Sequence, residues 1–348
     1  MPARGRRLAS GFVLALQAAT LTAQTPASAP VDTATLDRLL VAEDARGTGV
    51  DGLTPLLSAL EGKDTLLRRL AARGLGRIQR PELGRRLLPL LADPVPAVRT
   101  EAANAVAQSM RRVRRDTILT DGTQLTPREA AAALERALAT EQDAAVADAL
   151  GQSLGRLALP DSAAARTAEA AIRGRLAARQ TVGLVHGLYT LARARRATGN
   201  LSPGSVLLLR RTAIEAGDTA VRRLALRTLA AADGLDSATA VRTARDRDDE
   251  ARRMTLRGSG TLSPGLRAAL VRRALADPST IMRVEAVAAA RLGDSLPDCS
   301  PMLAAARDRE PYVALTAIDS LGGGCSGRNA AAAALRRIAD ASLTSGPP

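Results

Sequence analysis

Residues 53–78 read LTPLLSALEGKDTLLRRLAARGLGRI, and residues 87–106 read LLPLLADPVPAVRTEAANAV. Each stretch has an apolar segment, a short polar turn that contains aspartate, and a second segment with leucine, valine and alanine at helical spacing. Positions 60, 67, 68, 71, 72 and 75 of the first stretch match positions 91, 98, 99, 102, 103 and 106 of the second. The two stretches therefore predict one helix-turn-helix unit that is repeated along the chain.

The same unit can be followed through most of the sequence. Further second helices are expected at residues 146–157, 183–192, 221–230, 251–256, 282–292 and 313–322. Their first helices are expected at residues 127–139, 164–178, 203–216, 237–244, 264–276 and 301–306. Such a pair has an apolar stripe that only the next pair can bury. The pattern predicts an all-α, right-handed α-solenoid (α-α superhelix) of about eight helix pairs over residues 32–348.

The composition favours thin layers of helices over a globular core. Of 348 residues, 46% are hydrophobic, yet the chain has no Trp, one Phe and two Tyr. A globular enzyme of this length normally fills its core with aromatic side chains. Stacked helix pairs can be filled with Leu, Ala, Val and Ile alone.

Two aspartate-proline turns carry a family resemblance. Asp93 and Asp277 each precede a proline, and each is followed six residues later by an arginine, Arg99 or Arg283. This pattern resembles the HEAT-repeat family, including its short bacterial PBS-lyase-like variety, over roughly residues 53–338. The resemblance implies that these four residues form a structural ladder between neighbouring repeats. The third and fourth units lack the pair.

The positive charge of the chain is almost entirely due to arginine. Basic residues number 49 against 35 acidic ones, for a formal net charge of +14, and Lys63 is the only lysine. The excess has two interpretations, the coding bias of a GC-rich genome or a selected anion-binding surface. In HEAT arrays the second helices line the concave surface, so the resemblance implies a basic groove there. Its candidate residues are Arg69, Arg73, Arg223 and Arg227.

The N-terminus has the pattern of a secretion signal. Arginines at positions 4, 6 and 7 precede an apolar run over residues 8–19, and small residues follow. This order predicts a Sec-type signal peptide and short linker over residues 1–29, cleaved near Ala23 or Ala29, and a periplasmic or secreted protein. The alternative is a buried first helix of the fold. No later apolar stretch has the length of a membrane span.

Cys299 and Cys325 are the only cysteines, and each follows a predicted second helix, one unit apart. Corresponding loops of stacked repeats lie side by side, so a disulfide between adjacent units is possible if the Cα atoms lie within about 7 Å. An oxidising compartment favours this bridge over two free thiols.

The sequence gives little sign of chemistry. His186 is the only histidine, which rules out a multi-histidine metal site, and we expect it to pack between helices. No phosphate-binding loop, dinucleotide fingerprint or zinc spacing is present, so no catalytic, cofactor or metal residue is predicted. Residues 111–126 are expected to form a loop insertion between repeats, and residues 329–339 an incomplete last repeat.

Two functional interpretations follow. The first is a scaffold that binds a protein or peptide partner on its concave face and has no catalysis of its own. Nucleic acid is not expected as the partner, because the chain lacks aromatic residues for stacking on bases. The second rests on residues 311–322 with their flanking cysteines. Together with the signal peptide they resemble the HEAT arrays that precede a cyclophilin-type peptidyl-prolyl isomerase domain in some environmental bacteria, which implies an accessory region whose catalytic domain is absent here.

Overall fold

The computed structural model describes residues 33–46, 50–111, 124–194, 200–291, 299–321 and 328–345. Within these ranges the chain is helical and has no β-strand. The helices are α1 (Thr33–Asp44), α2 (Val50–Leu60), α3 (Thr65–Ile78), α4 (Pro81–Leu87), α5 (Pro96–Ser109), α6 (Pro127–Thr140), α7 (Ala144–Arg156), α8 (Ser162–Ala178), α9 (Val182–Ala194), α10 (Pro203–Glu215), α11 (Thr219–Ala231), α12 (Ser237–Thr243), α13 (Asp249–Arg257), α14 (Pro264–Leu275), α15 (Thr280–Arg291), α16 (Ser300–Ala305), α17 (Pro311–Leu321) and α18 (Arg328–Ser345). Two 3₁₀ turns, η1 (Leu88–Ala92) and η2 (Gly258–Thr261), extend α4 and α13.

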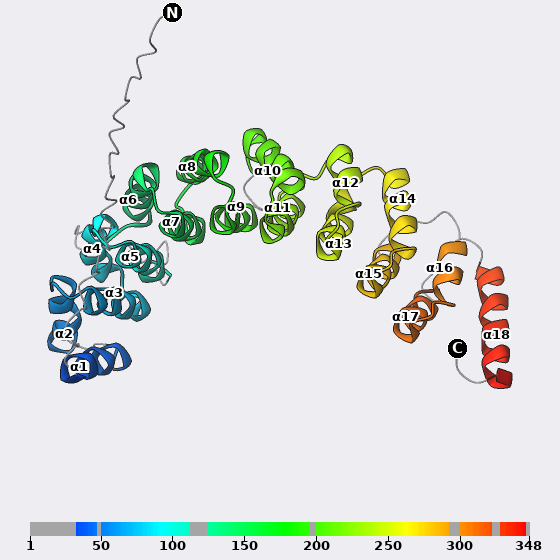
Figure 1. Cartoon of the computed structure of the whole chain (residues 1–348), viewed down its shortest axis with the longest axis horizontal. Coiled ribbons are helices and arrows are strands. Elements are labelled where there is room, and N and C mark those ends of the chain that lie inside the picture. The colour runs from blue at the N-terminus through cyan, green and yellow to red at the C-terminus, as the bar shows by residue number, and fades with distance from the viewer. Residues whose placement is uncertain are drawn as a thin grey trace, which may run out of the picture.

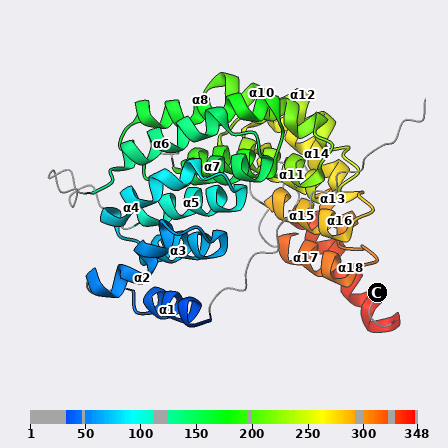
Figure 2. The same ribbon diagram turned by 60° about the vertical axis from the view of Figure 1, so that its left-hand side comes forward.

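The helices form two curved layers that follow one arc (Figure 1). The odd-numbered helices from α1 to α17 form the inner, concave layer, and the even-numbered helices from α2 to α16 form the outer layer. Each inner helix packs on the next inner helix and on its own outer partner. In Figure 2 the inner helices α3, α5 and α7 again lie one above the other. The predicted all-α solenoid is confirmed, and the described residues contain eight helix pairs from α2/α3 to α16/α17.

Most predicted helices lie where the pattern places them, with ends that differ by a few residues. The exception is the apolar segment 87–91, which forms most of the 3₁₀ turn η1, because α4 begins earlier, at Pro81. One inner helix, α1, was not predicted, because it precedes the first recognisable pair. The expected last helix extends beyond residue 339 to the end of α18 at Ser345. The predicted signal peptide lies outside the described residues, and so does the central part of the predicted insertion, residues 112–123.

Aspartate fixes where many of the helices begin. The carboxylate of Asp64 accepts a hydrogen bond from the backbone N–H of Leu67, which caps the first turn of α3. Aspartates cap five further helices in the same way: Asp143, Asp161, Asp218, Asp236 and Asp248. Thr126 and Glu129 form a reciprocal capping box at the start of α6.

The core between the layers is made of small and branched aliphatic side chains. On α5, Val98, Ala102, Ala103 and Val106 have no exposed surface. Alanine or glycine near the middle of most inner helices allows close approach of their neighbours, and Leu, Val or Ile on either side fills the remaining space. A core of this kind needs no aromatic residue, which explains the unusual composition.

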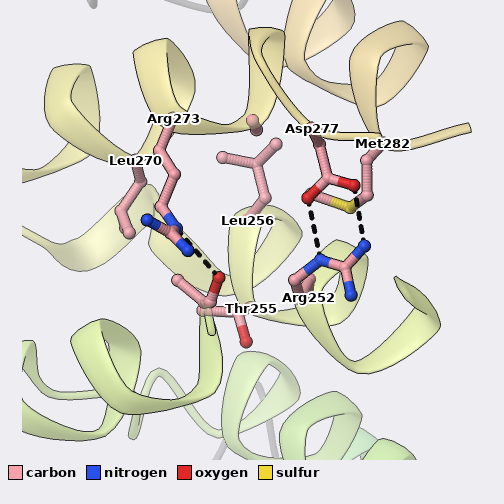
Figure 3. Close-up of a pocket in the computed structure, with 9 residues that line it drawn as sticks. Arg252, Thr255, Leu256, Leu270, Arg273, Asp277 and Met282 are labelled. Carbon is pink, nitrogen blue, oxygen red and sulfur yellow. Dashed lines mark hydrogen bonds and ion pairs between the residues drawn. The ribbon is translucent and has the colours of Figure 1, made fainter. Parts of the chain in front are cut away.

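An arginine bridge links successive repeats (Figure 3). Arg252, on α13, donates from Nε and Nη2 to the two carboxylate oxygens of Asp277 in the next turn, at 2.8 and 2.7 Å. Its Nη1 donates to the backbone carbonyls of Asp246 and Arg247 in its own turn, at 2.9 and 3.2 Å. One guanidinium therefore joins two inter-helix turns. The crevice beside the pair has a volume of only about 10 Å³, room for a water molecule at most.

Within the described residues the same bridge occurs at five places. The pairs are Arg68–Asp93, Arg99–Glu141, Arg222–Asp246, Arg252–Asp277 and Arg283–Asp308. The four ladder residues expected from the sequence all take part, and each forms its ion pair with a residue of a neighbouring repeat. Arg99 and Arg283 also donate to the backbone carbonyls of Asp93 and Asp277 in their own turns. Glu141 replaces aspartate in the pair that spans the predicted insertion, where the partners are 42 residues apart.

The ladder is interrupted at α7 and α9. In α5, α11, α13 and α15 the arginine directly follows a buried residue of the first turn, and at the equivalent position α7 has Ala147 and α9 has Val185. Glycines bring these two helices together instead: a Cβ atom added to Gly155 would lie 2.5 Å from the carbonyl oxygen of Gly187. Close backbone packing therefore replaces the ion pair where the ladder is absent.

We predict that Gly155→Ala destabilises the protein by about 1–3 kcal/mol, because two helix backbones must separate to admit the methyl group. Gly174→Ala on α8 is the matched control, since a Cβ atom there would meet nothing within 4 Å. The control should raise stability by about 0.5–1 kcal/mol. Urea unfolding followed by circular dichroism measures the free energy of unfolding of both variants. Equal effects of the two substitutions would contradict the glycine contact.

Arg252→Ala should cost about 2–4 kcal/mol, because it leaves the largely buried carboxylate of Asp277 without its charged partner. Arg257→Ala, whose side chain is 51% exposed, is the control and should change stability by less than about 0.5 kcal/mol. Thermal and urea unfolding test this prediction, and a smaller effect for Arg252 than for Arg257 would contradict it.

The ladder should also make stability depend on acid pH. Burial disfavours ionisation of Asp246 and Asp277, but the hydrogen bonds and charges of Arg222 and Arg252, together with backbone hydrogen bonds, lower the pKa of both carboxyls. The stabilisation is therefore complete above the unfolded-state pKa of about 3.9 and is lost as the pH falls through the lower folded-state values.

The double variant Asp246→Asn/Asp277→Asn should thus be less stable than the wild type at pH 7 and should lose less stability between about pH 5 and pH 2. The urea midpoint, measured across this range, provides the test. Parallel pH profiles for the two proteins would show that these carboxylates do not control acid unfolding.

Candidate functional site

Exposed side chains on the inner helices face the concave surface, because the outer layer and two inner neighbours cover the other sides of each helix. The four arginines expected there lie on two inner helices, Arg69 and Arg73 on α3 and Arg223 and Arg227 on α11. Helices α5, α7 and α9 separate them. The predicted residues therefore do not meet in one basic groove.

At the N-terminal end of the arc Arg73 and Arg77 are neutralised, whereas Arg69 is exposed and has no ion pair within the described residues. Glu43 of α1 is buried and forms ion pairs with Arg73 and Arg77 of α3. Arg69 and Arg73 line a groove of about 420 Å³ that also contains Glu101 of α5. Burial raises the pKa of Glu101 despite the charges of the two arginines. This part of the inner surface has mixed charge.

The C-terminal half of the inner surface is neutralised in the same way. Arg223 is ion-paired with Asp248, the residue that caps α13. Arg253 pairs with Glu250 on its own helix and, more weakly, with Glu285 of α15. Arg257 also pairs with Glu285, at 2.8 Å.

The centre of the arc differs. Arg156 of α7, Arg193 of α9 and Arg227 of α11 are exposed, and none of them has a carboxylate partner within the described residues. Arg193 donates to the Tyr189 hydroxyl at 3.1 Å. The Arg227 guanidinium lies over the Tyr189 ring, 4.8 Å from its centroid. We call Arg156, His186, Tyr189, Arg193 and Arg227 the central arginine cluster.

The positive charges of this cluster affect its two titratable rings. Burial lowers the pKa of His186, and the nearby charges of Arg156 and Arg227 lower it further. Burial alone would raise the pKa of Tyr189, but the hydrogen bond from Arg193 and the charges of Arg227 and Arg193 bring it below its usual value. His186 is therefore uncharged at neutral pH, and the net charge of the cluster comes from its arginines.

Sequence reasoning found one arginine of this cluster, Arg227. Arg156 and Arg193 lie at the C-terminal ends of their helices, beyond the matched repeat positions, which end at Leu75 and Val106. His186, expected to pack between helices, is only partly buried; its ring centroid lies 6.0 Å from that of Tyr189, and its Nδ1 has no hydrogen-bond partner. The signal in the sequence is an arginine on a second helix that has no acidic residue placed to be its ladder partner or to cap the neighbouring helix.

Other predicted features lie elsewhere or outside the described residues. Cys299 is buried beside α16, and Cys325 falls outside the described residues, so their disulfide stays a prediction. Within the described residues no three His, Cys, Asp or Glu side chains are grouped so as to hold a metal ion. In that same part of the chain no helix combines the length and the hydropathy required to cross a membrane.

Comparisons with known proteins agree with this architecture. Residues 53–155 match the family model described as HEAT repeats. An engineered protein, known from a crystal structure, superposes with a TM-score of 0.50 at 18% identity, over 88% of this chain and 90% of that chain. No curated protein matches the sequence.

A second solved structure is the complex of CpcE and CpcF of phycocyanin lyase from Nostoc sp. PCC7120. It has 17% identity and a TM-score of 0.34, over 83% of this chain and 94% of that chain. The engineered structure supports the fold alone, and the lower score of the lyase complex adds no argument. Residues 53–155 therefore match HEAT repeats, and helix pairs of the same arrangement continue to residue 321, so the described part of the chain is an α-solenoid.

Proposed function

We propose that this protein is a scaffold that binds a protein or peptide partner on its concave surface. The observation that carries the proposal is the central arginine cluster, a charged part of the inner surface that has no counter-charge from the described residues. Most surface arginines elsewhere on the inner helices are paired with carboxylates, and the exceptions within the described residues, Arg38 and Arg69, lie singly on α1 and α3. Exposed arginine and tyrosine are side chains that protein interfaces favour.

We also propose that the chain acts without catalysis. Its one histidine has no nucleophile or carboxylate within hydrogen-bond distance among the described residues, so the parts of a catalytic triad are not assembled there. Nearly all other groups with lowered pKa are helix caps or ladder carboxylates, which have structural roles. No feature of the described residues favours the alternative role beside an isomerase domain.

The location of the protein is part of the proposal. The basic, apolar and small-residue segments of positions 1–29 support export to the periplasm or beyond. A scaffold there would meet partners in an oxidising compartment, where the proposed Cys299–Cys325 bridge would be stable.

Site-specific photo-crosslinking tests the concave-surface proposal. A benzophenone amino acid is introduced at Thr100 on α5 or Arg257 on α13, both on the inner layer, and the full chain is expressed in its own organism. Leu207 on α10 and Val241 on α12, exposed on the outer layer, are the matched controls. We expect discrete protein adducts from the inner positions and few from the outer ones. Equal labelling of both layers, or none from the inner layer, would contradict a concave binding surface.

A further inference from the structure

We propose that the central arginine cluster binds a short acidic segment of a protein partner through its side-chain carboxylates. The inference rests on the proposed scaffold function and specifies the chemistry of the ligand. The cluster is formed by three successive inner helices, α7, α9 and α11, at the middle of the arc.

The distribution of counter-charges marks this position. Most arginines toward both ends of the inner surface already have carboxylate partners, Glu43 at one end and Asp248 and Glu285 at the other. They would have to lose these partners to bind an external anion. The arginines of the central cluster have none to lose within the described residues, so an anionic ligand gains their full attraction there.

The tyrosine holds two of the guanidinium groups in place. Tyr189 is only 8% exposed, so its ring is fixed by the packing of α9. Its hydroxyl accepts from Arg193, and its face supports Arg227. An arginine that is held before binding loses less side-chain entropy when it takes a carboxylate in its planar fork.

The same geometry disfavours nucleic acid. A single strand is bound through bases that stack on exposed aromatic rings, whereas the Tyr189 ring is buried and carries Arg227 over it. A long polyanion would also run onto the neutralised surface on either side of the cluster, where it gains little. A short acidic segment fits the extent of the unpaired charge.

The spacing of the helices sets the length of that segment. Neighbouring helices pack about 8–10 Å apart, so the two steps from α7 to α11 span roughly 16–20 Å. An extended chain advances about 3.3 Å per residue and covers this distance in about five or six residues. A hexaglutamate peptide is therefore the appropriate probe.

The test measures binding of fluorescein-labelled hexaglutamate to the full chain by fluorescence anisotropy in about 0.1 M salt. The variant Arg156→Ala/Arg193→Ala/Arg227→Ala should weaken binding at least about tenfold, since three charge-assisted contacts are removed. The control variant Arg166→Ala/Arg211→Ala/Arg242→Ala removes three exposed arginines from α8, α10 and α12 on the outer layer. Its net charge equals that of the test variant. The affinity of this control variant for hexaglutamate should stay within about twofold of that of the wild type. Circular dichroism establishes that both variants are folded.

Several results would overturn the inference. These are absence of hexaglutamate binding, equal binding by a labelled hexaglutamine peptide, or an equal loss of affinity in the two variants. Tighter binding of a labelled single-stranded oligothymidylate that depends on the same three arginines would assign the site to nucleic acid instead.

The outcome is separable from that of the scaffold proposal. Inner-surface crosslinks at Thr100 or Arg257 without specific hexaglutamate binding would retain the scaffold and remove this ligand. Specific hexaglutamate binding without inner-surface crosslinks would retain the anion site and contradict the scaffold function.

Discussion

The structure depends on the contact between one helix pair and the next, since a single pair cannot bury its own apolar stripe. Two devices fix that contact. In most units an arginine spans two successive turns, binding backbone carbonyls in its own turn and a carboxylate in the following one. Between α7 and α9 glycines allow the backbones to meet directly. Both devices hold neighbouring helices at a short and constant distance, which a core of small aliphatic residues requires.

The ladder also explains much of the charge of the protein. Its five arginines are partly buried and bound to carboxylates, and further arginines on α3, α11 and α13 are paired with acidic residues. A formal charge of +14 therefore says little about the surface that a partner meets. The relevant quantity is the unpaired arginine charge on the inner helices, and within the described residues its largest group, Arg156, Arg193 and Arg227, lies at the middle of the concave layer.

That position coincides with the interruption of the ladder. Helices α7 and α9 lack the ladder arginine, yet they supply Arg156 and Arg193 near their C-terminal ends. Packing through Gly155 and Gly187 keeps the two helices close, which brings His186 of α9 within the influence of the Arg156 charge of α7. The region with the weakest repeat signature is thus the region with the most distinctive surface.

The sequence by itself determined the helix pairs, their order and the solenoid, because the 3.6-residue spacing of apolar positions is a local signal that recurs along the chain, and aspartate caps mark the start of several helices. It also indicated that Asp93, Arg99, Asp277 and Arg283 belong to a ladder. Only the tertiary structure decided the partners, since Arg99 reaches Glu141 across 42 residues. The central cluster was likewise set by the stacking of α7, α9 and α11. Whether an arginine is paired depends on which helices become neighbours, and that contact is not encoded in any one repeat.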